Sequence, residues 1–224
     1  DLNWVYSTGG KVRAAPAVWR DTVFVASQDG YLYALNIRTG RQKWRVHLGS
    51  EIIFAPPVAR GEKVFVAAGS KLWAFDARLG HRRWDFPTPA LITGPIAVTD
   101  TRVYLADREG AIYCLDAATG RGEWRYPKEG TVDPIQTGVC LAGDAVVARA
   151  GTTSVLAVDA QTGRLIWQYK LPEGPVRVFR RTTVAGRRRG AMGGEAMMGP
   201  GAAGGLGGGG RAAGRGLGYA YGLK

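Results

Sequence analysis

The stretch that decides the fold is ALNIRTGRQKW, residues 34–44, because it returns three more times along the chain. The later copies are AFDARLGHRRW at 74–84, CLDAATGRGEW at 114–124 and AVDAQTGRLIW at 157–167. Their tryptophans, together with Trp4 near the start, follow one another at intervals of 40, 40, 40 and 43 residues. A fixed period of roughly 20–50 residues is typical of repeat proteins, so the chain predicts one structural unit used several times.

Each unit reads as four short strands. Alternating apolar runs stand before the motif, at residues 22–26 (TVFVA), 63–67 (KVFVA) and 102–106 (RVYLA), and they predict strands. Tight polar or glycine turns, such as 28–30 (QDG), separate these runs from the motif and predict hairpins. An apolar stretch around a proline, such as 15–18 (APAV), stands further upstream. Every repeat therefore predicts a small sheet of four antiparallel strands.

The motif itself predicts the last hairpin of each unit. One motif position always carries Asp or Asn: Asn36, Asp76, Asp116 and Asp159. Such a side chain accepts hydrogen bonds from backbone N–H groups two or three residues on and so nucleates a turn. Four residues later there is always a glycine: Gly40, Gly80, Gly120 and Gly163. Glycine can take the left-handed conformation of a type I turn with a G1 bulge, so we interpret the acidic residues as turn caps and not as a catalytic cluster.

The tryptophans predict how the units associate. Trp4, Trp44, Trp84, Trp124 and Trp167 all fall on the outermost strand of a unit, where an isolated sheet would expose them. Burying an indole removes about 150–250 Å² from water, so each ring needs a neighbouring sheet. We expect the turn glycine and a small motif residue to leave room for it; those small residues are Ala34, Ala74, Cys114 and Ala157. Single repeats are therefore not expected to fold alone.

The common form A-x-D-x-x-T-G-x-x-x-W resembles the tryptophan-docking motif of the PQQ-like β-propeller repeat family, over residues 2–170. Departures from it are Asn36, Leu79 and Cys114. WD40 repeats fit less well, because only Trp84 is followed by Asp and no Gly-His opens a repeat, and kelch repeats carry paired glycines. The resemblance implies an all-β propeller of four-stranded antiparallel blades, with the motif tryptophans clipping successive blades together.

The repeats predict the domain organisation. Four complete blades are expected at about 9–48, 49–88, 89–128 and 129–171, within a repeat domain of residues 1–180. Since family propellers close with more blades than this, we expect an incomplete or open propeller that needs further blades or a second copy to close the ring. Residues 2–6 match the last strand of a preceding blade and 174–179 a new first strand, so these ends are candidates for a partial fifth blade.

The last segment, residues 181–224, has a different composition. It holds 16 glycines and eight alanines and predicts a disordered Gly/Ala/Arg-rich tail, with an out-of-frame segment as the alternative. The formal charge of +12 divides equally between this segment and residues 1–180, so the repeats are only mildly basic. Nucleic-acid binding through the tail ranks low, because its Arg-Gly pairs are sparse and only Tyr219 and Tyr221 are available for stacking on bases.

Remaining features of the sequence point away from several other classes. No apolar run approaches the roughly 20 residues of a membrane helix, so no membrane span is predicted. Cys114 and Cys140 lack the spacing of a metal or redox pair, and we interpret both as buried thiols, with a disulfide in an oxidising compartment as the alternative. No catalytic residue and no metal ligand is assigned, and the chain is not expected to be an enzyme. Trp73 is expected in the packing between blades, with ligand stacking as a lesser alternative.

The resemblance carries the functional expectation. Relatives that bind no quinone include a periplasmic lipoprotein of the outer-membrane protein assembly machinery and sensor regions of bacterial kinases, which implies a non-catalytic binding or scaffold module in the bacterial periplasm, in the cell envelope or outside the cell. The partner is expected to be a protein or other macromolecule. The alternative is a fragment of a quinoprotein dehydrogenase that uses PQQ and calcium, although the adjacent Cys-Cys pair of many such enzymes is missing.

A partner site is expected on one face of the propeller. The loops 47–54 and 87–93 join the last strand of one unit to the first strand of the next. Loops carried on a rigid scaffold commonly supply binding residues, so this end is where we predict a partner.

Overall fold

The computed structural model describes residues 3–50, 54–130 and 132–171. Every described residue belongs to one compact unit of the chain. The regular secondary structure of the described residues consists of sixteen β-strands in four four-stranded antiparallel sheets. The predicted all-β fold of four-stranded units is therefore confirmed.

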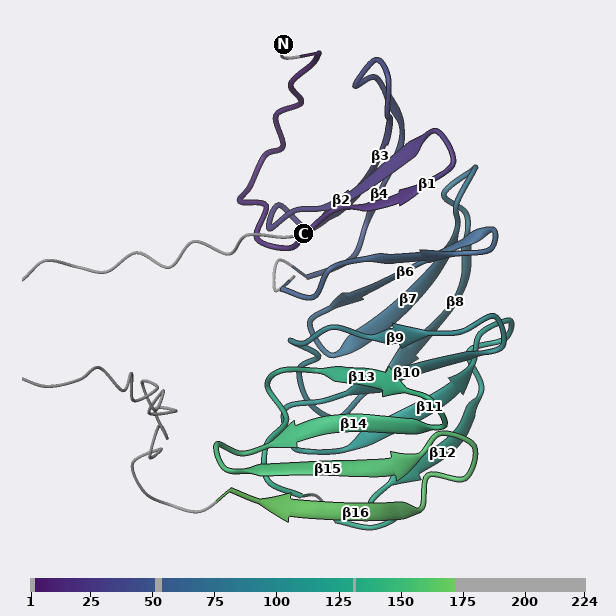
Figure 1. Ribbon diagram of the computed structural model, residues 1–224. Helices are drawn as coiled ribbons and strands as arrows, with labels where there is room; N and C mark the ends of the chain where they lie inside the picture. Colours follow the sequence, from purple (N-terminus) through teal and green to yellow (C-terminus); the bar gives the residue numbers. More distant parts are fainter. Residues whose placement is uncertain (1–2, 51–53, 131, 172–224) are drawn as a thin grey trace, which may run out of the picture. The chain divides into compact units, whose positions relative to one another are not determined.

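In each sheet the strands are neighbours in the order in which they follow along the chain (Figure 1). The first sheet consists of β1 (Ala17–Trp19), β2 (Thr22–Ala26), β3 (Tyr31–Asn36) and β4 (Gln42–His47). The second consists of β5 (Val58–Arg60), β6 (Lys63–Ala68), β7 (Lys71–Asp76) and β8 (Arg82–Pro87). The third consists of β9 (Ala97–Val98), β10 (Arg102–Ala106), β11 (Ile112–Asp116) and β12 (Gly122–Tyr126). The fourth consists of β13 (Val139–Ala142), β14 (Ala145–Ala150), β15 (Ser154–Asp159) and β16 (Leu165–Lys170).

Local hydrogen bonds explain why the motif turns where it does. Asp116 Oδ1 accepts hydrogen bonds from the N–H groups of Ala118 and Thr119 at 3.1 and 2.7 Å and from the Thr119 hydroxyl at 2.6 Å. These bonds, first that from the Thr119 hydroxyl, hold the pKa of Asp116 below its usual value. Gly120 closes the turn by donating to the backbone oxygen of Asp116 at 2.8 Å with φ of +74°. The turn is therefore fixed by residues within one motif.

The other three motifs repeat this turn. Asn36 accepts from the N–H groups of Arg38 and Thr39 at 3.0 Å, which shows why an amide can replace the carboxylate there. In every copy the register shifts by one residue next to the small motif residue, as a bulge does; the shifts follow Ala34, Ala74, Cys114 and Ala157. The predicted hairpin chemistry is therefore present in all four sheets.

The core lies between the sheets. In the first sheet the register places Phe24 opposite Ala34 and Ala34 opposite Trp44, so these side chains share one face. That face packs in one buried cluster with Val64 and Phe75 of the second sheet. Equivalent clusters join the second sheet to the third and the third to the fourth. Each sheet thus buries its apolar side chains mainly against its neighbours.

The first strands of neighbouring sheets, β1, β5, β9 and β13, approach one another along the stack, and the sheets follow one another from the first to the fourth (Figure 1). Residues 3–16 run beside the first sheet without forming a strand. Of the two segments considered for a fifth blade, residues 3–6 therefore join no sheet and residues 174–179 lie outside the described residues. The predicted tail, 181–224, also lies outside them.

The turn glycines give a test of the stacking. We expect Gly163→Ala to lower the free energy of unfolding by more than Gly143→Ala, measured by urea denaturation. Both positions have positive φ, +68° and +60°, so both variants lose about 1–2 kcal/mol to the left-handed conformation. A Cβ at Gly163 would lie 2.6 Å from Trp124 Cδ2, which adds about 1–3 kcal/mol of overpacking, whereas a Cβ at Gly143 meets nothing within 4 Å. Equal losses would contradict this packing.

Candidate functional site

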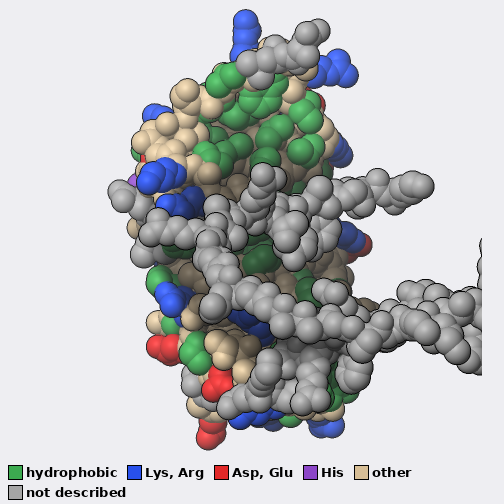
Figure 2. All heavy atoms as spheres, turned by 60° about the vertical axis from the view of Figure 1, so that its left-hand side comes forward, with side chains coloured by type: hydrophobic (Ala, Val, Ile, Leu, Met, Phe, Trp, Pro, Cys, Tyr) green, Lys and Arg blue, Asp and Glu red, His purple; other side chains and the backbone are tan. Residues whose placement is uncertain are grey.

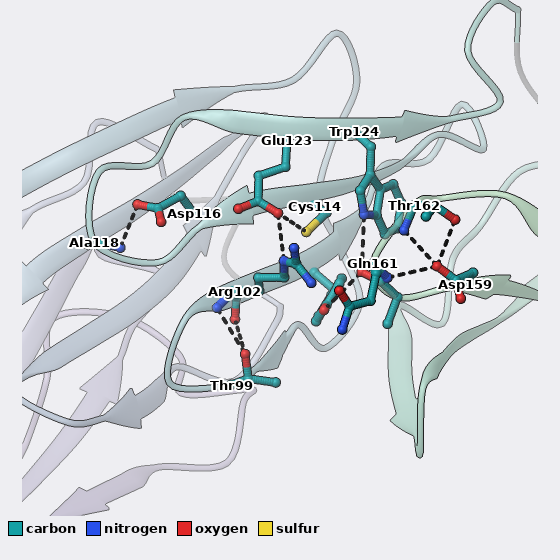
Figure 3. A network of polar contacts seen from close by, with 12 residues as sticks. Thr99, Arg102, Cys114, Asp116, Ala118, Glu123, Trp124, Asp159, Gln161 and Thr162 are labelled. Carbon is teal, nitrogen blue, oxygen red and sulfur yellow. Dashed lines mark hydrogen bonds and ion pairs between the residues drawn. The ribbon is translucent and has the colours of Figure 1, made fainter.

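Four of the five motif tryptophans lie on the glycine of the next turn along the stack. Trp124 contacts Gly163, and its Nε1–H donates to the backbone oxygen of Ala160 at 3.1 Å (Figure 3). The other contacts are Trp4 with Gly40, Trp44 with Gly80 and Trp84 with Gly120. We call this arrangement, an indole on the turn glycine of the following motif, a tryptophan seat. It is the geometry in which these predicted residues come together.

The acceptors of the indole N–H groups were not predicted. Trp4 donates to the backbone oxygen of Ile37 at 2.8 Å and Trp84 to that of Ala117 at 3.3 Å. Each acceptor is the first residue after the Asp or Asn of the motif, and the only signal for it is the recurrent Asp-Ala pair of the last three copies. Any residue can supply a backbone carbonyl, so the sequence pattern hardly indicates which residue accepts the indole N–H.

The small motif residues lie elsewhere in the arrangement. The register places Ala34 directly across from Trp44, and the same pairing holds for Ala74 with Trp84, Cys114 with Trp124 and Ala157 with Trp167. These residues therefore lie beside the indole of their own sheet, whereas the incoming indole of the preceding segment lies on the glycine.

Trp167 differs from the other four tryptophans. It lies on β16, where every residue is exposed, and its own side chain is 45% exposed. No described residue forms a seat for it, since the four turn glycines are each in contact with another tryptophan.

The two cysteines lie in different surroundings. Cys114 is buried, with Sγ 3.7 Å from Glu123 Oε2, and Glu123 pairs with Arg102 at 2.6 Å (Figure 3). Burial, with a smaller effect of Glu123, raises the pKa of the Cys114 thiol to about 12, so it is protonated and unreactive at neutral pH. Cys140 is exposed, and the prediction that both thiols are buried is wrong for it. Its side chain points to the face of β13 that no described sheet covers.

A cavity lies on the side of the stack where the loops after the fourth strands meet the turns between the second and third strands. Its volume is about 500 Å³, between the first and second sheets. Leu48, Gly49, Ser50 and Leu91 come from the two loops in which a partner site was predicted. The wall is completed by the β6–β7 turn with Lys71 and Trp73. We call it the Trp73 cavity.

Trp73 and Lys71 form part of the wall of this cavity. The indole of Trp73 stacks on Phe75 with ring centroids 6.0 Å apart, and Lys71 Nζ lies 4.8 Å from the centroid of the indole. The indole Nε1 atoms of Trp73 and Trp44 are both buried and have no hydrogen-bond partner in the described part of the chain. Lys71 is also paired with Asp85 at 3.3 Å. The cavity wall therefore combines an aromatic surface with one ammonium group.

Comparison with known proteins identifies the family. The family model described as "Outer membrane protein assembly factor BamB", of the PQQ-like repeat type, matches residues 2–93 and 85–215. The chain belongs to this family. BamB of Burkholderia pseudomallei is 28% identical over 190 residues, which cover 82% of this chain and 50% of that protein. The predicted relationship to PQQ-like repeats is thus confirmed.

Solved structures show the same fold. BamB of Moraxella catarrhalis superposes with a TM-score of 0.66 at 22% identity, over 76% of this chain and 56% of that chain. The quinohemoprotein alcohol dehydrogenase ADHIIG of Pseudomonas putida superposes with 0.64 at 20% identity, over 74% and 35%. The chain spans about half the length of the BamB relatives. At these identities, the superpositions show the β-propeller fold of the blades alone.

In the described ranges, no three or more His, Cys, Asp or Glu side chains are grouped to hold a metal ion. Cys114 and Cys140 stand on β11 and β13 and are not adjacent in sequence. No helix in those ranges is long and apolar enough to cross a membrane.

The seats predict unequal effects of removing tryptophans. We expect Trp84→Ala to lower the free energy of unfolding by about 3–5 kcal/mol, because Trp84 is 8% exposed and packs between two sheets. Trp167→Ala is the matched control, since the same ring on the exposed β16 should cost less than about 1 kcal/mol in dilute protein. Chemical denaturation of both variants measures the difference, and similar losses would refute the role of the seat.

Thiol reactivity distinguishes the two cysteines. Native protein at neutral pH should react with Ellman's reagent at one thiol, Cys140, and at Cys114 only after unfolding. Cys140→Ser should remove the fast reaction. Because the pKa of Cys114 is raised from 9.0 to about 12, the stability contributed by its protonated form is complete below pH 9 and declines as the pH rises towards 12. Fast labelling in Cys140→Ser would show that Cys114 is accessible.

Proposed function

We propose that this chain is a non-catalytic β-propeller module that binds a protein partner in the bacterial envelope through the face around the Trp73 cavity. The observation that carries the proposal is the partly exposed indole of Trp73 with Lys71 Nζ 4.8 Å from its centroid, both at the wall of a cavity of about 500 Å³. Aromatic side chains are enriched at protein interfaces, so this surface favours a partner.

The construction of this face supports the same proposal. Leu48 is buried and donates its backbone N–H to the backbone oxygen of Gly30 at 2.8 Å, and Ile92, next to Leu91, donates to that of Gly69 at 2.9 Å. Residues fixed in this way lose little conformational freedom on binding. Lys71 adds a positive charge beside the aromatic surface, which suits a segment of a partner that carries an acidic or carbonyl group next to an apolar side chain.

Family membership supports the kind of partner and the location. The relatives are named for the assembly of outer membrane proteins. We extend this to the present chain as a role in protein assembly at the bacterial outer membrane, with the envelope as the location.

Site-specific photo-crosslinking tests the binding face. A photoreactive residue is placed at Ser70, beside the Trp73 cavity, or at Glu62, at the other end of β6 as the matched control. Both side chains are exposed, so neither replacement disturbs the core. In cells of a bacterium that expresses the protein, we expect a defined crosslink to an envelope protein from position 70 and none from position 62, and Lys71→Ala, which removes the ammonium group at the cavity wall, should weaken it.

Two results would contradict the proposal. Crosslinks of equal yield from both ends of β6 would show that the cavity face has no special role. Saturable oxidation of alcohols by the protein after addition of PQQ and Ca²⁺ would favour the dehydrogenase alternative.

A further inference from the structure

Another cavity lies between the third and fourth sheets, at their outermost strands, and it shares no lining residue with the Trp73 cavity. Its volume is about 590 Å³. One wall is β12 with the residues that follow it, as far as Lys128, and the other is the turn before β16 with Leu165. We call this cavity the rim groove. The two sheets pack on each other in one buried cluster, so the rim groove belongs to a junction inside the stack and not to one of its ends.

The floor of the rim groove is aromatic and apolar. Trp124 and Tyr126 stand on β12 and are half-buried, and Leu165 at the start of β16 is 44% exposed. An apolar residue stands at this motif position in the fourth copy alone. The corresponding residues of the first three copies are Gln42, Arg82 and Gly122.

The equivalent position is occupied differently in other copies. Gln42 accepts a hydrogen bond from the Tyr6 hydroxyl at 2.6 Å. A Cβ at Gly122 would lie 3.9 Å from the ring of Phe86. Tyr6 and Phe86 each stand two residues after a motif tryptophan, as Tyr126 does. Where these copies have a direct contact, the fourth copy has the rim groove between the two corresponding side chains.

The connection from the third sheet to the fourth supplies one wall of the groove. It runs from β12 to β13 over residues 127–138 and is the longest of the three connections between described sheets. Arg125 fixes its start, because the guanidinium donates to the backbone oxygens of Pro127 and, at 2.8 Å, of Gly130. Pro127 and Lys128 are thereby held at the edge of the groove. A wall that is fixed before binding loses little conformational freedom when a ligand enters.

The rim groove is also positively charged. Its lining contains three cationic side chains, Arg125, Lys128 and Arg164, and one acidic side chain, Glu123. Glu123 is already paired with Arg102 at 2.6 Å (Figure 3), whereas Lys128 and Arg164 form no salt bridge with a described residue. Figure 2 shows Lys and Arg side chains at many places on the molecule, so the groove is distinguished by the combination of these charges with an aromatic floor.

We propose that the rim groove binds an extended segment of a partner protein in which an aromatic or aliphatic side chain is flanked by Asp or Glu. The apolar side chain packs on Trp124, Tyr126 and Leu165. The flanking carboxylates pair with Lys128 and Arg164, and charge-assisted hydrogen bonds of this kind also fix the direction of the segment. Tryptophan, tyrosine and arginine are the residue types that carry much of the binding energy in protein interfaces. This site does not depend on the function proposed for the Trp73 cavity.

Selection from a random peptide library displayed on phage tests the proposal. The library is first depleted on the immobilised Arg164→Glu variant of the full chain and then selected on the parent. We expect the enriched peptides to carry Asp or Glu next to an aromatic or aliphatic residue. Fluorescence polarisation with the synthetic peptide should give a dissociation constant that Arg164→Glu raises by about tenfold or more, because the reversed charge repels the carboxylate. Bound peptide should slow hydrogen exchange in residues 123–128 and 162–165.

Matched variants separate the groove from positive charge in general. Arg41→Glu changes the same motif position in the first copy, where the side chain is also exposed, and it should leave the affinity unchanged. Leu165→Gln introduces the residue that the first copy has at this position, and it should raise the dissociation constant by about tenfold, because the apolar contact is lost. Lys71→Ala, in the wall of the Trp73 cavity, should have no effect on peptide binding, so each proposal can fail without the other.

Any of three results would overturn the proposal. The first is a selection in which no peptide remains after depletion on the Arg164→Glu variant. The second is a peptide that binds Leu165→Gln as tightly as the parent, or that loses as much affinity with Arg41→Glu as with Arg164→Glu. The third is equal binding of a peptide whose apolar residue is replaced by Ser, which would show that the groove recognises negative charge alone.

Discussion

The contact between an indole and a left-handed glycine is the constraint on which the rest of the structure depends. At each seat two requirements meet at one residue. The turn needs positive φ, and the ring needs the volume that a side chain would fill, because a Cβ would lie 2.5 to 2.8 Å from the nearest indole atom. Glycine satisfies both, so the residue that closes one hairpin also determines where the preceding segment can pack.

This constraint explains why the molecule has no single centre of packing. Each buried cluster belongs to two sheets, and inner sheets contribute one face to each of two clusters. The stability of such a stack approximates a sum of terms between neighbours. Among the described sheets, the fourth has a neighbour on one face, and every residue of its outer strand β16 is exposed.

Much of this organisation could be predicted from the sequence because it depends on local chemistry. Each hairpin requires particular side chains, namely the Asp or Asn cap, the glycine and the tryptophan. The hairpins and their repetition could therefore be recognised in the sequence. The carbonyl acceptors at Ala117 and Ala160 were not, because any residue supplies a backbone oxygen. The exposure of Cys140 was missed because an alternating strand pattern does not state whether a neighbour covers each face. The Trp73 cavity was only partly predicted, since its loops were named but the place of Trp73 and Lys71 in its wall depends on tertiary packing.

The similarity of the four hairpin turns has a consequence for how a gene that encodes these repeats can change. Trp44 meets Gly80 in the same way as Trp84 meets Gly120, and both intervals between tryptophans are 40 residues. Loss of one whole 40-residue repeat by unequal crossing-over would bring Trp44 to the next motif turn, which has the same cap and glycine. Every remaining contact between neighbouring sheets would still join a tryptophan to a turn glycine. Loss of a few residues within a period would instead separate a cap from its glycine. Lineages with this fold can therefore gain or lose blades in whole units far more easily than they can tolerate small deletions.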